Sequence, residues 1–286
     1  MNSVKVEIPI HLQFVELVEK AFDLLDAEAQ QKVIQFVIGR QHPGGAFVDR
    51  AGTPDLYYSL FGFWLASALK MKDQLMLLQK YTSARSVDDE RNLINKSALA
   101  LIRQGLSGKK KMRLNFFRVF LKRDYQVNFS YQLFLFLLVF DASVGRRSWL
   151  YFVARLVLRM YQLPIGAPCS MLAALLVARH EVGLETAKLQ KRILAYFDEA
   201  NGFKAFEQMD SGDMLSTGVA LFALQKTGFD LRLLAPACFG MIQANFSDGA
   251  FLSDDGDSTR DLEYTFYGLL ALGSLTGKEN GLEPSS

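Results

Sequence analysis

Apolar residues recur at helical spacing along most of this chain. From Leu12 onward they return every three or four positions, whereas the alternation typical of β-strands is almost absent. A first apolar stripe runs through 12–25, and Pro9 stops a helix from continuing back through 4–10, which favours an extended opening segment. The pattern predicts an all-α protein whose first helix is an extra layer outside those that follow.

From residue 27 on, helices with one polar side alternate with helices that are apolar nearly all round. A helix of the first kind lies at the surface, and one of the second kind is enclosed. The alternation predicts about six hairpins, each of one outer and one inner helix. The expected spans are 27–41 with 55–70, 72–85 with 88–105, 109–122 with 127–141, 147–161 with 168–183, 185–198 with 213–228, and 231–245 with 261–276.

One motif recurs at the start of three inner helices. A Gly-aromatic loop, such as Gly44-Gly45-Ala46-Phe47, precedes an aspartate that opens a run of small and leucine residues. These aspartates are Asp55, Asp213 and Asp261. A period of about 40 residues indicates a repeat architecture. Because neither end of the array is polar enough to cap an open solenoid, we expect a closed ring whose inner helices are parallel around a central axis.

Composition and charge narrow the class of protein. The 286 residues are 50% hydrophobic, and the repeat favours a single domain over 1–286, with 1–26 as an N-terminal extension and 277–286 as a flexible tail. The 32 basic and 30 acidic residues nearly cancel, so we expect no nucleic-acid partner.

The lack of a recognisable targeting signal and the positions of the cysteines favour a cytoplasmic protein. The start of the chain has no apolar segment typical of a secretory signal, and the apolar run 129–140 is shorter than the roughly 18 to 20 residues that a membrane span needs. Cys169 and Cys238 are far apart and outside any Cys-x-x-Cys or Cys/His spacing, which favours two packed thiols over a disulfide framework.

The repeats resemble those of the protein prenyltransferase β subunits and the terpenoid cyclases. The resemblance is carried by the Gly-Gly-x-Phe loop, by Pro-Asp-x-x-Tyr-Ser at 54–59 and by Asp-x-x-Tyr-Thr at 261–265. It is close over 44–70 and 248–276, fair over 201–228 and weak between them. Members of this superfamily form an α/α toroid of six helical hairpins, so the resemblance implies an α6–α6 toroid here.

The resemblance does not extend to the zinc site of the prenyltransferases. Leu215 stands where that pattern has a cysteine, and Tyr264 stands where it has a histidine. Zinc needs nitrogen or sulfur ligands, or several carboxylates, in a tetrahedron, and two of the three ligands of that pattern are missing here. Acidic residues precede Asp213 and Asp261, whereas those enzymes place basic residues there for a diphosphate. We therefore expect no metal and no cofactor, and protein prenylation is disfavoured.

Class II terpenoid cyclases protonate their substrate with an Asp-x-Asp-Asp motif, which this chain lacks. The nearest acidic clusters lie at 210–213 and 254–257; Asp and Gly are also ordinary turn residues, and Asp is a favoured N-cap. The catalytic hypothesis is that Asp213 or Asp261, with Asp55 at the same mouth of the ring, has a raised pKa and donates a proton. A weaker alternative is a cation held by Asp255, Asp257, Asp261 and Glu263, whose spacing does not match an EF-hand loop.

Aromatic residues on the expected inner helices complete the candidate site. The predicted substrate-binding residues are Tyr57, Tyr58, Trp64, Phe129, Tyr131, Ser216, Tyr264 and Tyr267. Aromatic walls stabilise carbocations, and they also simply fill cores. The main hypothesis is a terpenoid-cyclase-like enzyme, acid-initiated and metal-independent, acting on a long isoprenoid or lipid-like substrate in a central cavity.

Several alternatives stay open at the level of sequence. The toroid could be a non-catalytic ligand-binding or protein-interaction module that has lost the superfamily's catalytic residues. It could also be a zinc-free prenyltransferase-like protein, or a glycosidase that uses two carboxylates. The basic run 109–113 begins an amphipathic helix over 109–121, which favours either a solvated face or a peripheral membrane contact. The sequence does not predict an oligomeric state.

Overall fold

The computed structural model describes residues 8–90, 92–107, 129–144, 149–252 and 259–276. Within these ranges the chain forms 12 helices and two short antiparallel β-ribbons, which confirms the all-α prediction. The helices are α1 (Ile10–Asp23), α2 (Ala27–Gly39), α3 (Leu56–Ala68), α4 (Lys72–Ser83), α5 (Leu93–Ser107), α7 (Phe129–Ser143), α8 (Trp149–Met160), α9 (Cys169–Glu181), α10 (Ala187–Leu194), α11 (Met214–Lys226), α12 (Ala235–Ala244) and α13 (Leu262–Leu275). The ribbons pair β1 (Phe197–Asp198) with β2 (Gly202–Phe203) and β3 (Phe246–Ser247) with β4 (Ala250–Phe251).

Most of the predicted helix positions are confirmed. Two expected spans are too long: residues 88–90 are not helical, and the span 185–198 runs past α10 into strand β1. Each of α2 to α5 and α7 to α13 coincides with one expected span, with ends that differ by a few residues. The predicted outer helix at 109–122 and the flexible tail at 277–286 lie outside the described residues.

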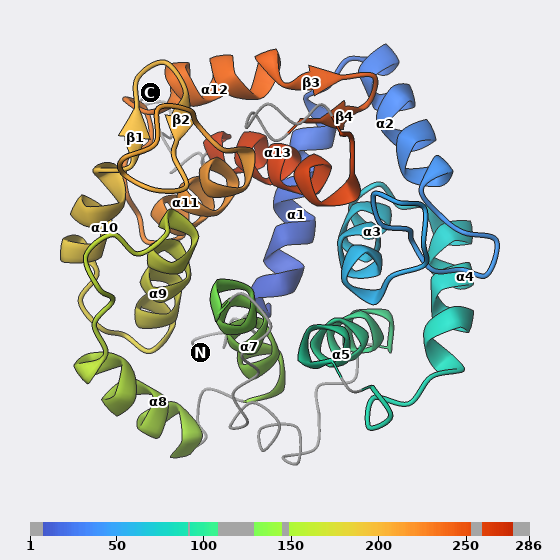
Figure 1. The fold of residues 1–286 in the computed structure, drawn as a ribbon, viewed down its shortest axis with the longest axis horizontal. Helices are drawn as coiled ribbons and strands as arrows, with labels where there is room; N and C mark the ends of the chain where they lie inside the picture. The colour runs from blue at the N-terminus through green and yellow to red at the C-terminus, as the bar shows by residue number, and fades with distance from the viewer. Residues whose placement is uncertain (1–7, 91, 108–128, 145–148, 253–258, 277–286) are drawn as a thin grey trace, which may run out of the picture.

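The inner helices contact one another in a closed cycle. α3 packs on α5, α5 on α7, α7 on α9, α9 on α11, α11 on α13, and α13 returns to α3. Figure 1 shows these helices around the centre, with α2, α4, α8, α10 and α12 along the rim. Most residues of α3, α11 and α13 are buried, as expected for helices that are apolar on all sides.

The recurring motif builds the same local structure three times. Each of Asp55, Asp213 and Asp261 is an N-cap whose carboxylate accepts a hydrogen bond of 2.8 Å from the backbone N–H three residues on. In two copies the loop phenylalanine also lies flat on a glycine of the inner helix: a Cβ on Gly62 or Gly268 would lie 2.3 Å from that ring. The motif therefore sets both the start of the inner helix and the packing of its loop.

Helix α1 lies across the C-terminal ends of the inner helices. Its first residue, Ile10, donates its N–H to Asp141 near the end of α7, at 2.7 Å, and Lys226 at the end of α11 donates to Gln13 Oε1, also at 2.7 Å. A Cβ on Gly273, near the end of α13, would meet the Leu17 backbone at 2.0 Å, so the two helices are in close contact there. In Figure 1, α1 runs lengthwise behind the inner helices. The predicted extra layer is thus a cover over one end of the ring.

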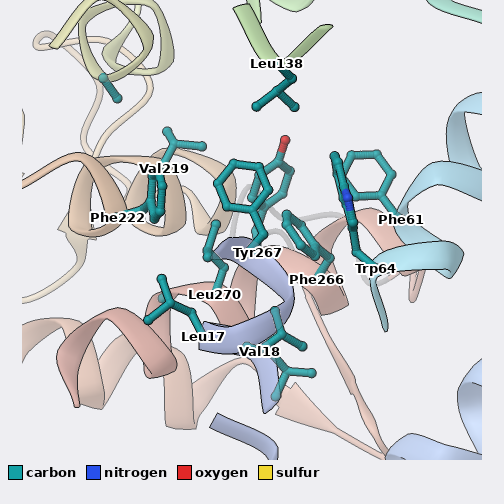
Figure 2. Packing of buried hydrophobic residues seen from close by; sticks show 14 of the residues in the cluster. Leu17, Val18, Phe61, Trp64, Leu138, Val219, Phe222, Phe266, Tyr267 and Leu270 are labelled. Atoms are coloured by element: carbon teal, nitrogen blue, oxygen red, sulfur yellow. The ribbon is translucent and has the colours of Figure 1, made fainter. Parts of the chain in front are cut away.

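The apolar side of α1 fills the centre. The Phe14 ring centroid lies 4.8 Å from that of Phe222, 5.5 Å from that of Trp64 and 5.7 Å from that of Phe266. Figure 2 shows side chains of α3, α7, α11 and α13 converging on this region. An apolar cavity of about 30 Å³ remains beside Phe14, between α1, α7, α9, α11 and α13.

Candidate functional site

The N-terminal ends of α3 and α13 meet at the end of the ring opposite α1. Arg50, in the loop before α3, places its Nε 2.6 Å from Asp261 Oδ2. Tyr57, in the first turn of α3, donates its hydroxyl to Glu263 Oε1 at 2.7 Å. Residues more than 200 positions apart therefore share one polar cluster, defined here by Arg50, Tyr57, Asp261 and Glu263.

Glu263 is the unusual group of this cluster. Glu263 is only 7% exposed to solvent. Burial raises the pKa of the Glu263 carboxyl to about 7, against the hydrogen bond from Tyr57, and the charge of Asp261 adds to the rise. A carboxyl that titrates near neutral pH is suited to act as a general acid or base.

Asp213 belongs to the same end of the ring. Its charge contributes to the raised pKa values of Glu263 and of Cys169 at the start of α9. Its Oδ2 accepts from both the N–H of Ser216, at 2.8 Å, and the hydroxyl of Ser216, at 2.5 Å. Asp213 and Asp261 thus both act on Glu263, while their carboxylates cap their own helices.

Asp55 is the third of these aspartates. Burial raises its pKa, while the backbone hydrogen bond from Tyr58 acts in the opposite direction. Its neighbour Tyr58 is also affected by burial, which raises the pKa of its hydroxyl to about 12, and the charge of Asp261 adds to that rise. Tyr58 therefore stays protonated at neutral pH.

Arg50 is the cation of the polar cluster. Besides its bond to Asp261, its guanidinium lies over the Tyr264 ring, 5.3 Å from the centroid, in a cation–π contact. The sequence reasoning missed Arg50 and treated Glu263 only as a possible cation ligand. A signal was present for Glu263, since it is a charged residue in the first turn of a helix that is otherwise apolar.

The remaining predicted residues lie elsewhere. Trp64 and Tyr267 are in the packed core, at 0% and 2% exposed, and they face Phe266 rather than an open space (Figure 2). Phe129 and Tyr131 belong to α7, but their side chains lie outside the described residues, as do the acidic cluster 254–257 and the basic helix 109–121.

The described part of the chain shows neither a metal site nor a membrane-spanning helix. No group of three or more His, Cys, Asp or Glu side chains there is arranged to hold a metal ion. In the same ranges, none of the helices has the length and apolar character that crossing a membrane requires.

Comparisons with known proteins identify no relative of this chain. No protein-family model matches the chain, and no curated protein or solved structure matches it significantly. The proposals below therefore rest on the residues and on their geometry.

Proposed function

We propose that the chain is an α/α toroid of six helical hairpins that acts as an interaction protein and does not enclose a substrate. The observation that carries this proposal is the position of Phe14. Its ring lies among the inner helices of the closed cycle, in contact with aromatic side chains of α3, α11 and α13. In the described residues the place where an isoprenoid would lie is occupied by the protein itself.

The volume of the cavity beside Phe14 supports the same proposal. Pockets for small molecules usually measure about 300 to 1,000 Å³. The cavity beside Phe14 measures about 30 Å³, which is room for one or two water molecules. A long apolar ligand would have to displace α1, whose residues Ile10, Phe14 and Val18 are at most 3% exposed.

Native mass spectrometry and thermal unfolding with added polyprenyl alcohols test the proposal. The wild-type protein is expected to show no bound isoprenoid, no change in Tm and no product. Phe14→Ala is the informative variant, because the cavity it opens should bind benzene while remaining too small for a polyprenyl chain. An isoprenoid that co-purifies with the wild-type protein, or is converted by it, would overturn the proposal.

A second candidate is an acid-initiated, cyclase-like reaction, and the observation that favours it is the pKa of about 7 at Glu263. In this reaction Glu263, rather than one of the aspartates, would give its proton to an alkene, and Tyr57 would orient the carboxyl. Turnover of squalene or geranylgeranyl substrates that declines as pH rises through 7 would support it. Glu263→Gln should then abolish that turnover, whereas the exposed Glu28→Gln should leave it unchanged; absence of product in every protein would exclude it.

A further inference from the structure

Helix α8 presents apolar side chains to solvent. An outer helix normally turns its apolar side inward. Tyr151 is the buried residue of α8, and six of the 12 residues are large apolar side chains exposed to solvent. These residues are Trp149, Phe152, Val153, Leu156, Val157 and Met160. Their spacing of three and four places them on one face of the helix, called here the α8 face.

The other outer helices do not share this feature. Among the described residues, α4 exposes Met76 and Leu77, α12 exposes Phe239, and α2 exposes Ile38. Single exposed apolar residues of this kind are normal on soluble proteins, whereas a contiguous patch marks a contact surface. Figure 1 places α8 on the rim of the molecule, next to α9. The α8 face is therefore directed away from the ring.

The stretch of sequence that contains α8 is strongly basic. Between residues 91 and 180 the sequence has 15 basic and two acidic residues, while the whole chain has 32 and 30. From 142 to 180 there is no acidic residue, and Arg146 and Arg147 come shortly before Trp149 in the sequence. The near-zero net charge of the chain thus hides a basic portion, which attracts anionic surfaces.

A basic hollow lies beside the α8 face. It has a volume of about 390 Å³ and is lined by Arg155, Arg159, Arg179, Gly183, Leu184 and Glu185. Arg179 donates to the backbone carbonyls of Leu158 and Tyr161, at 3.2 and 3.1 Å, and so fixes the end of α8. Arg155 and Arg159 project from α8 into solvent. Both guanidinium groups are placed to meet phosphate at the edge of the apolar face.

We propose that the α8 face docks on an anionic phospholipid membrane, with its apolar side chains in the acyl boundary and Arg155 and Arg159 on headgroup phosphates. Aromatic and aliphatic residues flanked by arginine are the combination that binds such a surface. This inference rests on the proposed function, in which the protein acts through its outside.

Two other occupants fit the face less well. Nucleic acid offers no partner for six apolar side chains. A second copy of the chain would form a two-fold interface in which each α8 face meets its own counterpart. Arg155, Arg159 and Arg179 of both copies would then come together, with Glu185 as the acidic residue that lines the hollow beside them.

Tryptophan fluorescence gives a direct test. The chain has two tryptophans: Trp64 is fully buried and Trp149 is 70% exposed. Vesicles of phosphatidylcholine with phosphatidylserine should shift the emission of Trp149 to the blue, and brominated lipid should quench it. Vesicles of phosphatidylcholine alone should bind at least about tenfold more weakly, and added salt should weaken binding to the anionic vesicles.

Variants separate the two parts of the face. Phe152→Ser with Leu156→Ser should lower vesicle partitioning at least about tenfold through lost apolar area. Arg155→Gln with Arg159→Gln should lower it about tenfold and reduce its salt dependence. The matched control is Leu77→Ser with Phe239→Ser, which removes exposed apolar residues from α4 and α12 and should leave binding unchanged. Circular dichroism verifies that each variant is folded.

Three results would overturn the inference: no binding to anionic vesicles, equal loss in the control variant, or a dimer in sedimentation velocity that Phe152→Ser with Leu156→Ser dissolves. The last result would identify a second copy as the occupant. Failure of membrane docking leaves the interaction function standing, whereas conversion of an isoprenoid in the turnover assay refutes that function whatever the vesicles show.

Discussion

Arg50 Nε lies 2.6 Å from Asp261 Oδ2, and this contact joins the first repeat to the last across 211 positions of sequence. The Asp261 side chain is only 2% exposed, whereas that of Arg50 is 38% exposed. The pair connects the loop before α3 to the N-cap of α13, which is where the cycle of inner helices closes.

Removing the cation should therefore weaken ring closure. We expect Arg50→Gln to lower the free energy of unfolding by about 2 kcal/mol, because it leaves a buried carboxylate without its partner. Urea denaturation measures the change. Arg232→Gln is the control: its pair with Asp230 is exposed, and its loss should cost less than about 1 kcal/mol. Equal effects of the two substitutions would contradict a special role for Arg50.

The filled centre makes Phe14 a critical core residue. Phe14→Ala should destabilise the protein by about 3 to 5 kcal/mol, since it removes a buried ring and leaves a cavity. Leu24→Ala, at an exposed position just past the end of α1, should stay within about 0.5 kcal/mol of wild type. Denaturant unfolding of both variants checks this, and a small effect of Phe14→Ala would mean that α1 is only loosely seated.

Two buried groups should give opposite dependences of stability on pH. Burial lowers the pKa of His11 to about 4 from an ordinary 6.5. The free energy of unfolding therefore decreases as pH falls from 6.5 toward 4, because the unfolded state binds the proton first. The pKa of Glu263 is raised from an ordinary 4.5 to about 7. The free energy of unfolding therefore decreases as pH rises from 4.5 toward 7, because the unfolded state loses the proton first. Between about pH 4.5 and 6.5 the two slopes oppose each other, and wild-type stability should be nearly flat.

Single variants should reveal each slope. His11→Leu leaves Glu263 alone, so stability should decrease with rising pH by about 3 kcal/mol over that window. Glu263→Gln leaves His11 alone, so stability should increase with rising pH by a similar amount. Urea titrations at several pH values measure both, and the double variant should be flat again. Parallel slopes in the two single variants would refute the assignment.

The recurring aspartates should behave as helix caps. Asp213→Asn retains a side-chain acceptor and should cost only a few tenths of a kcal/mol, whereas Asp213→Ala should cost about 1 to 2 kcal/mol. If turnover of any substrate is found, a cap predicts that the Asn variant keeps it and an acid predicts that it does not. Thermal unfolding of both variants, with the assay beside it, separates the two roles.

Much of the fold could be predicted because its signals are local. The apolar stripe of an outer helix, the all-apolar run of an inner helix and the aspartate at its start lie within a few turns of one another, and the observed spans of α2, α3 and α13 follow them closely. Asp55, Asp213 and Asp261 cap their helices through atoms three residues away. The inner helices contact one another in a closed cycle, from α3 through α13 and back to α3.

The polar cluster could not be predicted in the same way. Arg50 and Asp261, like Tyr57 and Glu263, meet only because the ring closes. The raised pKa of Glu263 depends on burial by residues from other helices, which no spacing along the chain reveals. For the same reason the α8 face went unnoticed: an amphipathic pattern shows that a helix has an apolar side, but it does not show toward which neighbour that side turns.

Helix positions, caps and the repeat are thus properties of short stretches of this chain, since backbone hydrogen bonds and side-chain periodicity act within a few residues. Whether the ring is hollow was decided by packing between distant segments, when α1 placed Phe14 among α3, α11 and α13. Steric exclusion and desolvation depend on which surfaces meet, and those surfaces come together only in the folded molecule.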